Sequence, residues 1–397
     1  MTATSPAVTA PDAQTSPIPF ADCWITDEAQ AAAQRVLASG WVTTGAECQL
    51  FEAELASYVG AEHAVAVSSC TAAIELSLRS LRLDPGAPVL TSTMTFCGAV
   101  HAIEHAGLRP VLVDVDPVTG MPDESTVAQA AAGCSPRPAA MVLVHWSGDT
   151  FDRAALAAAA GLPESRVVED AAHALGSEHA GVPVGDGPAV CFSFYATKNL
   201  PIGEGGMVTT DDPERAAWLR SARLHGMSQD AWRRYLPGGG WRYDVRESGL
   251  KANLTDLQAA IGRAQLHSLA LWQDRRARLA ARYDAGLACL PEVQRPHRPR
   301  VHQGVHAWHL YAVQLADAER RDHVANALAQ QGIGTSVHFI PVHHMTHFAG
   351  LAPAAGLPGA DRMFDRLLSL PLYPRLGAGQ VDRVAAVVTD ALEGVSR

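Results

Sequence analysis

The sequence has little of what marks membrane proteins or secreted proteins. No apolar run in its 397 residues approaches the ~20 residues that a helix needs to cross a bilayer. The first twenty residues are rich in Ala, Thr, Ser and Pro, and they have neither the basic start nor the apolar core of a secretory signal. We therefore expect no membrane association, and we expect residues 1–19 to form a disordered tail.

Cysteine pairs and basic residues are also scarce. The seven cysteines are scattered and no two of them form a Cys-x-x-Cys pair, so we expect reduced thiols in a cytoplasmic protein. Lys and Arg number 31 against 41 Asp and Glu, for a formal net charge of -10, and the basic residues form no concentrated patch for a phosphate backbone. Nucleic acid is therefore not an expected partner.

What the sequence does contain is an alternation of strand and helix patterns. Residues 62–69 read as a buried strand, and residues 71–81 repeat apolar side chains at helical spacing. This unit recurs, which predicts an α/β fold with a mostly parallel sheet covered by helices. The length favours a large domain over residues 20–275, and the later patterns predict a smaller α+β domain over residues 276–397.

Ligands of such sheets bind at the carboxyl ends of the strands, where "CFSFYATKNLPIGEGG" places Lys198. Lys198 follows Phe194 by four residues, among apolar, hydroxylic and small side chains. Half-buried there, its ammonium would lose hydration, its pKa would fall, and the neutral amine could attack an aldehyde. The alternative is a surface lysine at the edge of a loop.

Asp170 ends the strand pattern "RVVED", and adjacent strand ends in a parallel sheet lie close together. An acid at that position can keep the nitrogen of a pyridine ring protonated, which turns a pyridoxal ring into an electron sink. The alternative is that Asp170 or Glu169 caps the helix that follows.

Other residues at strand ends and at a helix start could bind a phosphate group or stack on a planar ring. "SSCTAAIEL" offers hydroxyls and free N–H groups at a helix start, where a dianion is favoured. By strand alternation the hydroxyl of Ser193 points the same way as Tyr195 and Thr197. Phe96 ends another strand pattern, where it could stack on a ring or belong to the core. Together these residues predict a site for pyridoxal 5'-phosphate (PLP).

The stretch "VVEDAAHALGSEHAGVPVGDGPAVCFSFYATKNLPIGEGGMVTTDD" resembles the heart of the DegT/DnrJ/StrS family of PLP-dependent sugar aminotransferases, which have the aspartate-aminotransferase-like fold type I. The resemblance continues in "GWVTTGAECQLFEAELASYVGAEHAVAVSSCTAAIELSL", "TFCGAVHAIEHAGLRPVLVDVDPVTG", "RYDVRESGLKANLTDLQAAIGRAQL", "WHLYAVQL", "VHFIPVH" and "LSLPLYP". It spans roughly residues 20–390 in the order of the family.

The resemblance implies a role for each matching residue. Lys198 matches the lysine that forms a Schiff base with PLP, Asp170 the acid at the pyridine nitrogen, and His173 the residue beside the ring hydroxyl. Phe96 matches the aromatic residue that stacks on the ring. The matches to the phosphate-binding residues are Cys70, where many members have Gly, Thr71 and Ser193. Asn253 matches an asparagine that reaches the phosphate of the neighbouring subunit, which implies a homodimer with shared sites.

The resemblance also implies the reaction. Some relatives carry His in place of the Schiff-base lysine and act as sugar dehydratases, whereas this chain keeps Lys198. We therefore expect transamination from glutamate or glutamine to a nucleotide-linked keto-deoxysugar, in antibiotic or cell-surface sugar biosynthesis. One alternative is an aminotransferase for a keto-cyclitol or another ketone. The other is a non-catalytic regulatory or binding protein, against which Lys198 and Asp170 argue.

Histidines concentrate in "VHFIPVHHMTHF", whose four members follow no common zinc spacing, so no metal site is predicted. His338 and His343 match a family stretch near the substrate, and we expect His338 to contact the sugar or its phosphate. His145 and Trp146 follow a strand pattern, and they line the acceptor pocket or form a packed core pair. In another part of the chain, Asn253 is expected to cap a helix over residues 253–272.

Overall fold

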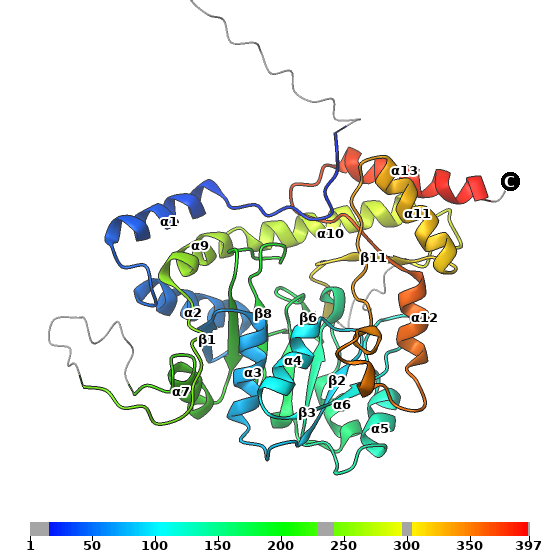
Figure 1. The fold of residues 1–397 in the computed structure, drawn as a ribbon. Helices are drawn as coiled ribbons and strands as arrows, with labels where there is room; N and C mark the ends of the chain where they lie inside the picture. Colours follow the sequence, from blue (N-terminus) through cyan, green and yellow to red (C-terminus); the bar gives the residue numbers. More distant parts are fainter. Residues whose placement is uncertain (1–15, 229–241, 296–303, 396–397) are drawn as a thin grey trace, which may run out of the picture.

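The computed structural model describes residues 16–228, 242–295 and 304–395, and a seven-stranded sheet lies at its centre (Figure 1). The strand order is β1-β9-β8-β5-β4-β2-β3. The strands are β1 (His63–Val67), β2 (Pro88–Ser92), β3 (Arg109–Val113), β4 (Ala140–Val144), β5 (Val167–Asp170), β8 (Val190–Ser193) and β9 (Gly206–Thr210). Because β9 alone runs antiparallel to its neighbours, the predicted mostly parallel sheet is confirmed.

Helices cover both faces of this sheet, as the alternation of its buried side chains requires. Val65 and Val67 of β1 pack on the side of α3, α4 and α7, whereas Ala64 and Ala66 pack on the side of α2 and α9. Towards β3, α5 and α6 cover that second side. The bounds are α2 (Ala46–Val59), α3 (Cys70–Ser80), α4 (Cys97–His105), α5 (Glu124–Ala132), α6 (Arg153–Ala160), α7 (Pro213–Ala222) and α9 (Asp256–Leu266).

The C-terminal part builds a second core around a two-stranded antiparallel sheet of β11 (Tyr311–Gln314) and β12 (Leu367–Leu370). Its helices are α10 (Leu269–Gly286), α11 (Ala318–Gln330), α12 (Pro358–Arg366) and α13 (Ala378–Val395). The predicted disordered tail over residues 1–19 lies outside the described residues up to residue 15, and for residues 16–19 the prediction is wrong. Ile18 is buried in this core, and its backbone exchanges hydrogen bonds with Gly332 and Gly334.

Several shorter elements complete the described chain. The first helix, α1 (Asp27–Ser39), packs on α9 through small apolar side chains. A small antiparallel sheet contains β6 (Glu178–His179), β7 (Val182–Pro183) and β10 (Gly304–Val305). The 3-10 helices are η1 (Trp146–Gly148), η2 (Glu164–Arg166), η3 (Val342–His344) and η4 (Ala349–Leu351). None of the helices in the described ranges is both long and apolar enough to span a membrane.

The helix predicted over residues 253–272 is two helices, and the prediction that Asn253 caps it is wrong. The N-cap of α9 is Thr255, whose hydroxyl accepts the N–H of Gln258 at 3.3 Å in a capping box. Asn253 instead forms an isolated β-bridge with Val67. Asp256 lies in the first turn as predicted, and its carboxylate accepts the N–H groups of Gly45 and Cys48 at the start of α2.

The boundary predicted near residue 275 falls inside α10. Leu269, at the start of this helix, is buried in the core beside the large sheet, whereas Tyr283, near its end, is buried in the C-terminal core. In Figure 1, α10 lies between α9 and the C-terminal helices α11 and α13. One continuous helix therefore belongs to both cores, and the division into two domains remains a prediction.

Candidate active site

The carboxyl ends of β5 and β8 and the amino end of α3 meet at a cavity of about 490 Å³. Eight of the nine residues predicted for the site line it. They are Cys70, Thr71, Phe96, Asp170, His173, Ser193, Lys198 and His338. Residues more than 260 positions apart in the sequence are thus brought to one edge of the sheet, and Asn253 is the predicted residue that does not line the cavity.

Lys198 follows β8 in a turn that its own N–H closes by donating to the carbonyl of Tyr195 at 2.9 Å. Leu200 and Ile202, just beyond it, are buried and anchor the turn. The side chain of Lys198 lies half-buried at the cavity wall. Loss of hydration lowers the pKa of its ammonium to about 8, against the opposing attraction of Asp170 and Cys70. This is therefore not the surface lysine of the alternative interpretation.

Asp170 is the buried carboxylate of the cavity, with 5 % of its surface exposed. One of its oxygens, Oδ1, accepts the N–H of Ala172 at 3.1 Å and lies 3.5 Å from Sγ of Cys70. Burial raises the pKa of Asp170, and the N–H of Ala172 and the ammonium of Lys198 act in the opposite direction. The raised pKa makes this carboxylate a stronger hydrogen-bond acceptor for a protonated group in the cavity.

The neighbouring acid, Glu169, faces away from the cavity. Its carboxylate lies 2.8 Å from Nε2 of His145 and 2.8 Å from Nη1 of Arg153. The strand alternation of β5 therefore separates two adjacent acids into different environments. The alternative that one of these acids caps a following helix is wrong, because residues 171–177 form turns and not a helix. Asp170 is the acid at the cavity, and Glu169 belongs to an internal ion pair.

The amino end of α3 suits a phosphate group. Ser69 is its N-cap and accepts the N–H of Ala72 at 3.1 Å, while Cys70 and Thr71 begin the helix at the cavity. The N–H groups of a first turn have no partner within the helix, and the helix dipole favours a dianion there. Gly206 on β9 is required for this packing, because a Cβ atom at that position would lie 2.4 Å from the carbonyl carbon of Ser69.

Aromatic rings form another wall of the cavity. Phe96 immediately precedes α4, and its side chain is 59 % exposed, so it is not the core residue of the alternative interpretation. His173 is buried, and its Nδ1 accepts the N–H of Ser147 at 3.2 Å. Burial lowers the pKa of His173 well below its usual value, and Lys198 adds to this effect, so the ring is neutral.

Among the lining residues that were not predicted for the site are two rings, His309 and Phe339. The ring of His309 lies 4.2 Å from that of His173, and the ring of Phe339 stacks on His173 at 5.6 Å between centroids. Both come from the C-terminal part of the chain, more than 100 positions after Lys198. The available signal was their place in "WHLYAVQL" and "VHFIPVH", two stretches that resemble the family.

His338 also lines the cavity, as predicted. Its Nδ1 lies 3.0 Å from the hydroxyl of Ser369, and its ring stacks on Phe20. Burial, with a contribution from Lys198, lowers the pKa of His338 to about 4, so this histidine is neutral at physiological pH. A neutral imidazole both donates and accepts hydrogen bonds, which suits a contact with a sugar hydroxyl.

His145, Trp146 and His343 do not line the cavity. His145 stacks on Phe151 at 4.1 Å, and the indole N–H of Trp146 donates to the carbonyl of His338 at 2.8 Å. Of the two interpretations offered for His145 and Trp146, the packed core pair therefore holds. Trp146 still affects the site, because its hydrogen bond holds the backbone of the cavity residue His338 in place.

Asn253 lies beside the cavity rather than in it. Its amide donates to the hydroxyl of Thr44 at 2.7 Å, and its oxygen accepts from the ammonium of Lys251. Its backbone bridges Val67, three residues before Cys70. The side chain thus does not contribute to the cavity of its own chain.

The chemistry of this cavity matches one kind of cofactor, an aldehyde on a pyridine ring with a phosphate. The amine of Lys198, the acid of Asp170 and the start of α3 are suited to its three functional groups. Such a site at the carboxyl edge of a mixed seven-stranded sheet fits a PLP-dependent enzyme of fold type I.

Comparisons with known proteins give the family. The model of the DegT/DnrJ/EryC1/StrS aminotransferase family matches residues 24–389. SpsC, a spore coat polysaccharide biosynthesis protein of Bacillus subtilis (strain 168), is 43% identical over 366 residues, which cover 90% of this chain and 92% of SpsC. The chain belongs to this family and is a PLP-dependent sugar aminotransferase, so the predicted family, enzyme class and cofactor are confirmed.

Solved structures agree with this assignment. DesV of S. venezuelae, solved in complex with a ketimine intermediate, is 36% identical with a TM-score of 0.84, and the match covers 95% of this chain and 98% of DesV. The PLP-form of Spr1654 from Streptococcus pneumoniae is 29% identical with a TM-score of 0.87, over 96% of this chain and 100% of that chain. The predicted fold class is confirmed by both.

Proposed function

We propose that this enzyme moves an amino group from glutamate or glutamine to the keto group of a nucleotide-linked deoxysugar. The observation that carries the proposal is the single cavity that brings Lys198, Asp170 and the start of α3 together. The relative SpsC supports a sugar acceptor, since it is described as a polysaccharide biosynthesis protein.

We assign one task to each residue that would hold the cofactor. Lys198 would bond to the aldehyde, Asp170 would keep a proton on the ring nitrogen, and Phe96 would pack against the ring. Cys70, Thr71 and Ser193 would hold the phosphate, and His173 would contact the ring hydroxyl. When bound, PLP supplies an electron sink for the bond that breaks at the carbon bearing the substrate amine.

The remaining work is proton transfer by Lys198. The amine of Lys198 would be the base that takes the proton from the α-carbon of the amino donor. A pKa of about 8 suits this task, because the neutral and charged forms are both populated near neutral pH. His338 is proposed to hydrogen-bond the acceptor sugar or its phosphate from the far wall of the cavity.

The proposal is tested by the visible spectrum of the purified protein with PLP, before and after glutamate or glutamine. A cofactor band that bleaches with the donor would support the amino-donor half of the reaction. A panel of nucleotide-linked keto-deoxysugars and a keto-cyclitol is then offered to the aminated enzyme. Return of the band with a nucleotide sugar supports the proposal, and return with the cyclitol alone overturns the proposed acceptor. A protein that binds no cofactor would instead fit the non-catalytic alternative.

The depressed pKa of Lys198 has a measurable consequence for loading of the cofactor. Only the neutral amine attacks an aldehyde, and with a pKa of about 8 its population rises roughly tenfold per pH unit below pH 8 and then levels off. We therefore expect the rate at which PLP-free protein takes up PLP to rise from pH 6 and to reach a plateau just above pH 8. Stopped-flow absorbance measures this rate. A rate that continues to climb to pH 10 would indicate an ordinary lysine.

We also propose a homodimer in which Asn253 of one subunit reaches the phosphate in the other. The shared site is supported by the position of the Asn253 side chain, which bonds Thr44 and is not among the residues that line the cavity of its own chain. Asn253→Ala should weaken PLP binding about tenfold, as expected for one lost hydrogen bond to a charged group. Thr44→Val removes the hydroxyl that accepts from the amide of Asn253 and keeps Asn253 itself, so it is the matched control. Equilibrium dialysis gives the affinity, and an unchanged value in Asn253→Ala would contradict the shared site.

A further inference from the structure

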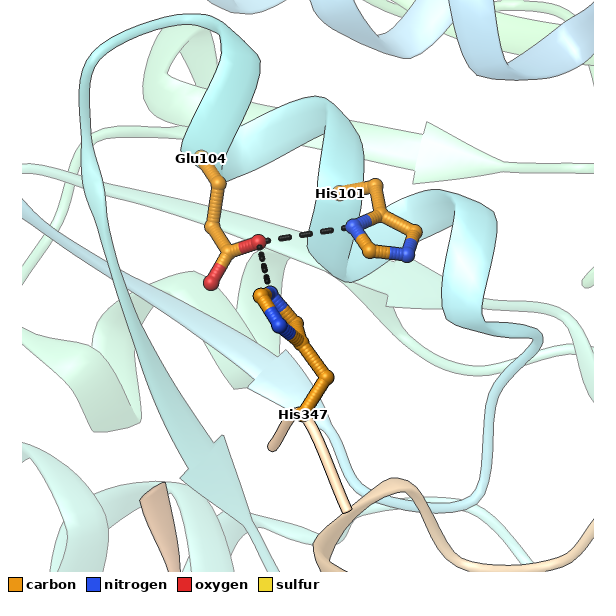
Figure 2. A group of neighbouring side chains, drawn as sticks. All are labelled: His101, Glu104 and His347. Atoms are coloured by element: carbon orange, nitrogen blue, oxygen red, sulfur yellow. Dashed lines mark hydrogen bonds and ion pairs between the residues drawn. The ribbon is translucent and has the colours of Figure 1, made fainter. Parts of the chain in front are cut away.

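Two histidines and a glutamate meet at the outer face of α4, away from the cofactor cavity. His101 and Glu104 are separated by three positions on α4, so they lie on the same face of the helix. His347 comes from the segment between η3 and η4 and points at the same place (Figure 2). Within the described ranges, this is one of two clusters of three such side chains.

The distances in this cluster correspond to those of a metal site. One oxygen of Glu104, Oε2, lies 3.4 Å from Nδ1 of His101 and 3.1 Å from Nε2 of His347, and all three atoms are within 4.8 Å of one another. Tetrahedral zinc with bonds of about 2.0–2.1 Å holds its ligands roughly 3.3 Å apart. A small movement of either imidazole therefore places all three atoms around one ion.

The surroundings hold the imidazoles in place and leave one side open. The rings of His101 and His347 pack against Phe348, at 4.9 Å and 4.7 Å between centroids, and Phe348 is itself buried. The side chain of His347 is 63% exposed, and that of Glu104 is 32% exposed. Water can therefore complete the coordination from the solvent side.

We propose that His101, Glu104 and His347 form a binding site for a divalent transition-metal ion of the zinc class. Two imidazoles and one carboxylate are donors that zinc accepts, and their net charge of -1 partly neutralises the ion. Proximity in the sequence does not disclose this site, because only His347 belongs to the histidine-rich stretch. The expectation that the chain has no metal site is replaced by this proposal.

The site would join two segments that both reach the cofactor cavity. Phe96, at the cavity, immediately precedes α4, and the segment that carries His347 begins with the cavity residues His338 and Phe339. A bound ion would hold this segment against α4. The role assigned to the ion is therefore to fix the wall formed by His338 and Phe339, with no part in the chemistry of transamination.

The second cluster, formed by His343, His344 and Asp361, is a weaker candidate for a metal site. His343 and His344 both direct Nε2 at the same oxygen of Asp361, at 2.9 Å and 2.8 Å. The other ring nitrogen of His343 lies 2.7 Å from the hydroxyl of Thr93, so this ring already links two parts of the fold. Both separations from Asp361 are shorter than the roughly 3.3 Å between ligands of a tetrahedral zinc ion, so this cluster serves as a control.

The test is calorimetric titration of ZnCl2 into tag-free, full-length, PLP-loaded protein that has been treated with EDTA and then freed of it. We expect one equivalent to bind, and we expect His347→Ala and Glu104→Gln each to lower the affinity at least about tenfold. The same variants should lose the intense visible absorption that tetrahedral Co²⁺ produces. His267→Ala is the matched control, because His267 is an exposed histidine that faces a single glutamate, Glu28, at 3.2 Å.

Three outcomes would overturn the proposal. The first is no uptake of Zn²⁺ by the parent protein, in which case the three side chains are only hydrogen-bonded to one another. The second is equal uptake by the parent, His347→Ala and Glu104→Gln. The third is uptake that His344→Ala abolishes and His347→Ala does not, which would place the ion at Asp361. Loss of uptake in Glu104→Gln with an unchanged melting temperature excludes misfolding as its cause.

Discussion

Lys198→Ala is expected to reduce kcat by at least about 10⁴-fold, the largest effect of any single substitution in this enzyme. Covalent attachment of the cofactor and transfer of the α-proton are both assigned to the same amine, and proton transfer alone contributes up to about 10⁴-fold. PLP should still bind, since the start of α3 and Asp170 are unchanged. Steady-state transamination assays at saturating substrates measure the loss.

The chain contains two lysines, Lys198 and Lys251, so Lys251 provides a control for this prediction. Borohydride reduction of the PLP-loaded protein should label the peptide of Lys198, and Lys251→Arg should leave the labelling unchanged. Lys198→Arg keeps a positive charge but provides no neutral amine, so it should be as inactive as the alanine variant. Steady-state turnover by Lys198→Ala would disprove the assignment.

Asp170→Asn should have the second-largest effect, a loss of about 10²–10³-fold in kcat. The asparagine keeps the shape of the side chain and can still accept the N–H of Ala172, but it cannot hold a proton on the ring nitrogen through a negative charge. The substitution also removes the attraction that raises the pKa of Lys198. The pH at which PLP uptake reaches its plateau should therefore fall below 8, which the stopped-flow assay detects.

Glu169→Gln is the matched control for Asp170→Asn. It alters the adjacent carboxylate, which faces His145 and Arg153 and not the cavity. We expect it to lower the melting temperature, because it breaks a buried ion pair, and to leave kcat of the folded, PLP-loaded enzyme within a few-fold of the parent. If the two substitutions reduced kcat equally, Asp170 would have no special role at the cofactor.

Local pattern was sufficient to find the residues of the cavity that follow strands of the central sheet. Lys198 and Asp170 could be predicted because each comes at the end of a buried strand, and the geometry of a parallel sheet brings such ends together. His309 and Phe339 could not be found in this way. They belong to the C-terminal part of the chain, and only the packing of that part against the sheet places them beside His173.

The start of α9 could not be predicted from the N-cap preference of single residues. Asn253 and Thr255 are both good N-cap residues, so the preference alone does not choose between them. The pair Thr255 and Gln258 has the spacing of a capping box, and this pattern would have selected the correct start. The backbone of Asn253 is instead held by β1, a contact between distant segments that no local pattern encodes.

The continuity of α10 limits how the enzyme can admit its substrates. The 18 residues of α10 form a helix roughly 27 Å long, at 1.5 Å per residue. One end of this helix packs in the core beside the large sheet and the other end in the C-terminal core. A hinge near residue 275 would have to break several consecutive helical hydrogen bonds, so a swing of the C-terminal part about that point is opposed. Movements of side chains that line the cavity leave this helix intact, so we expect entry and release of substrates to depend on them.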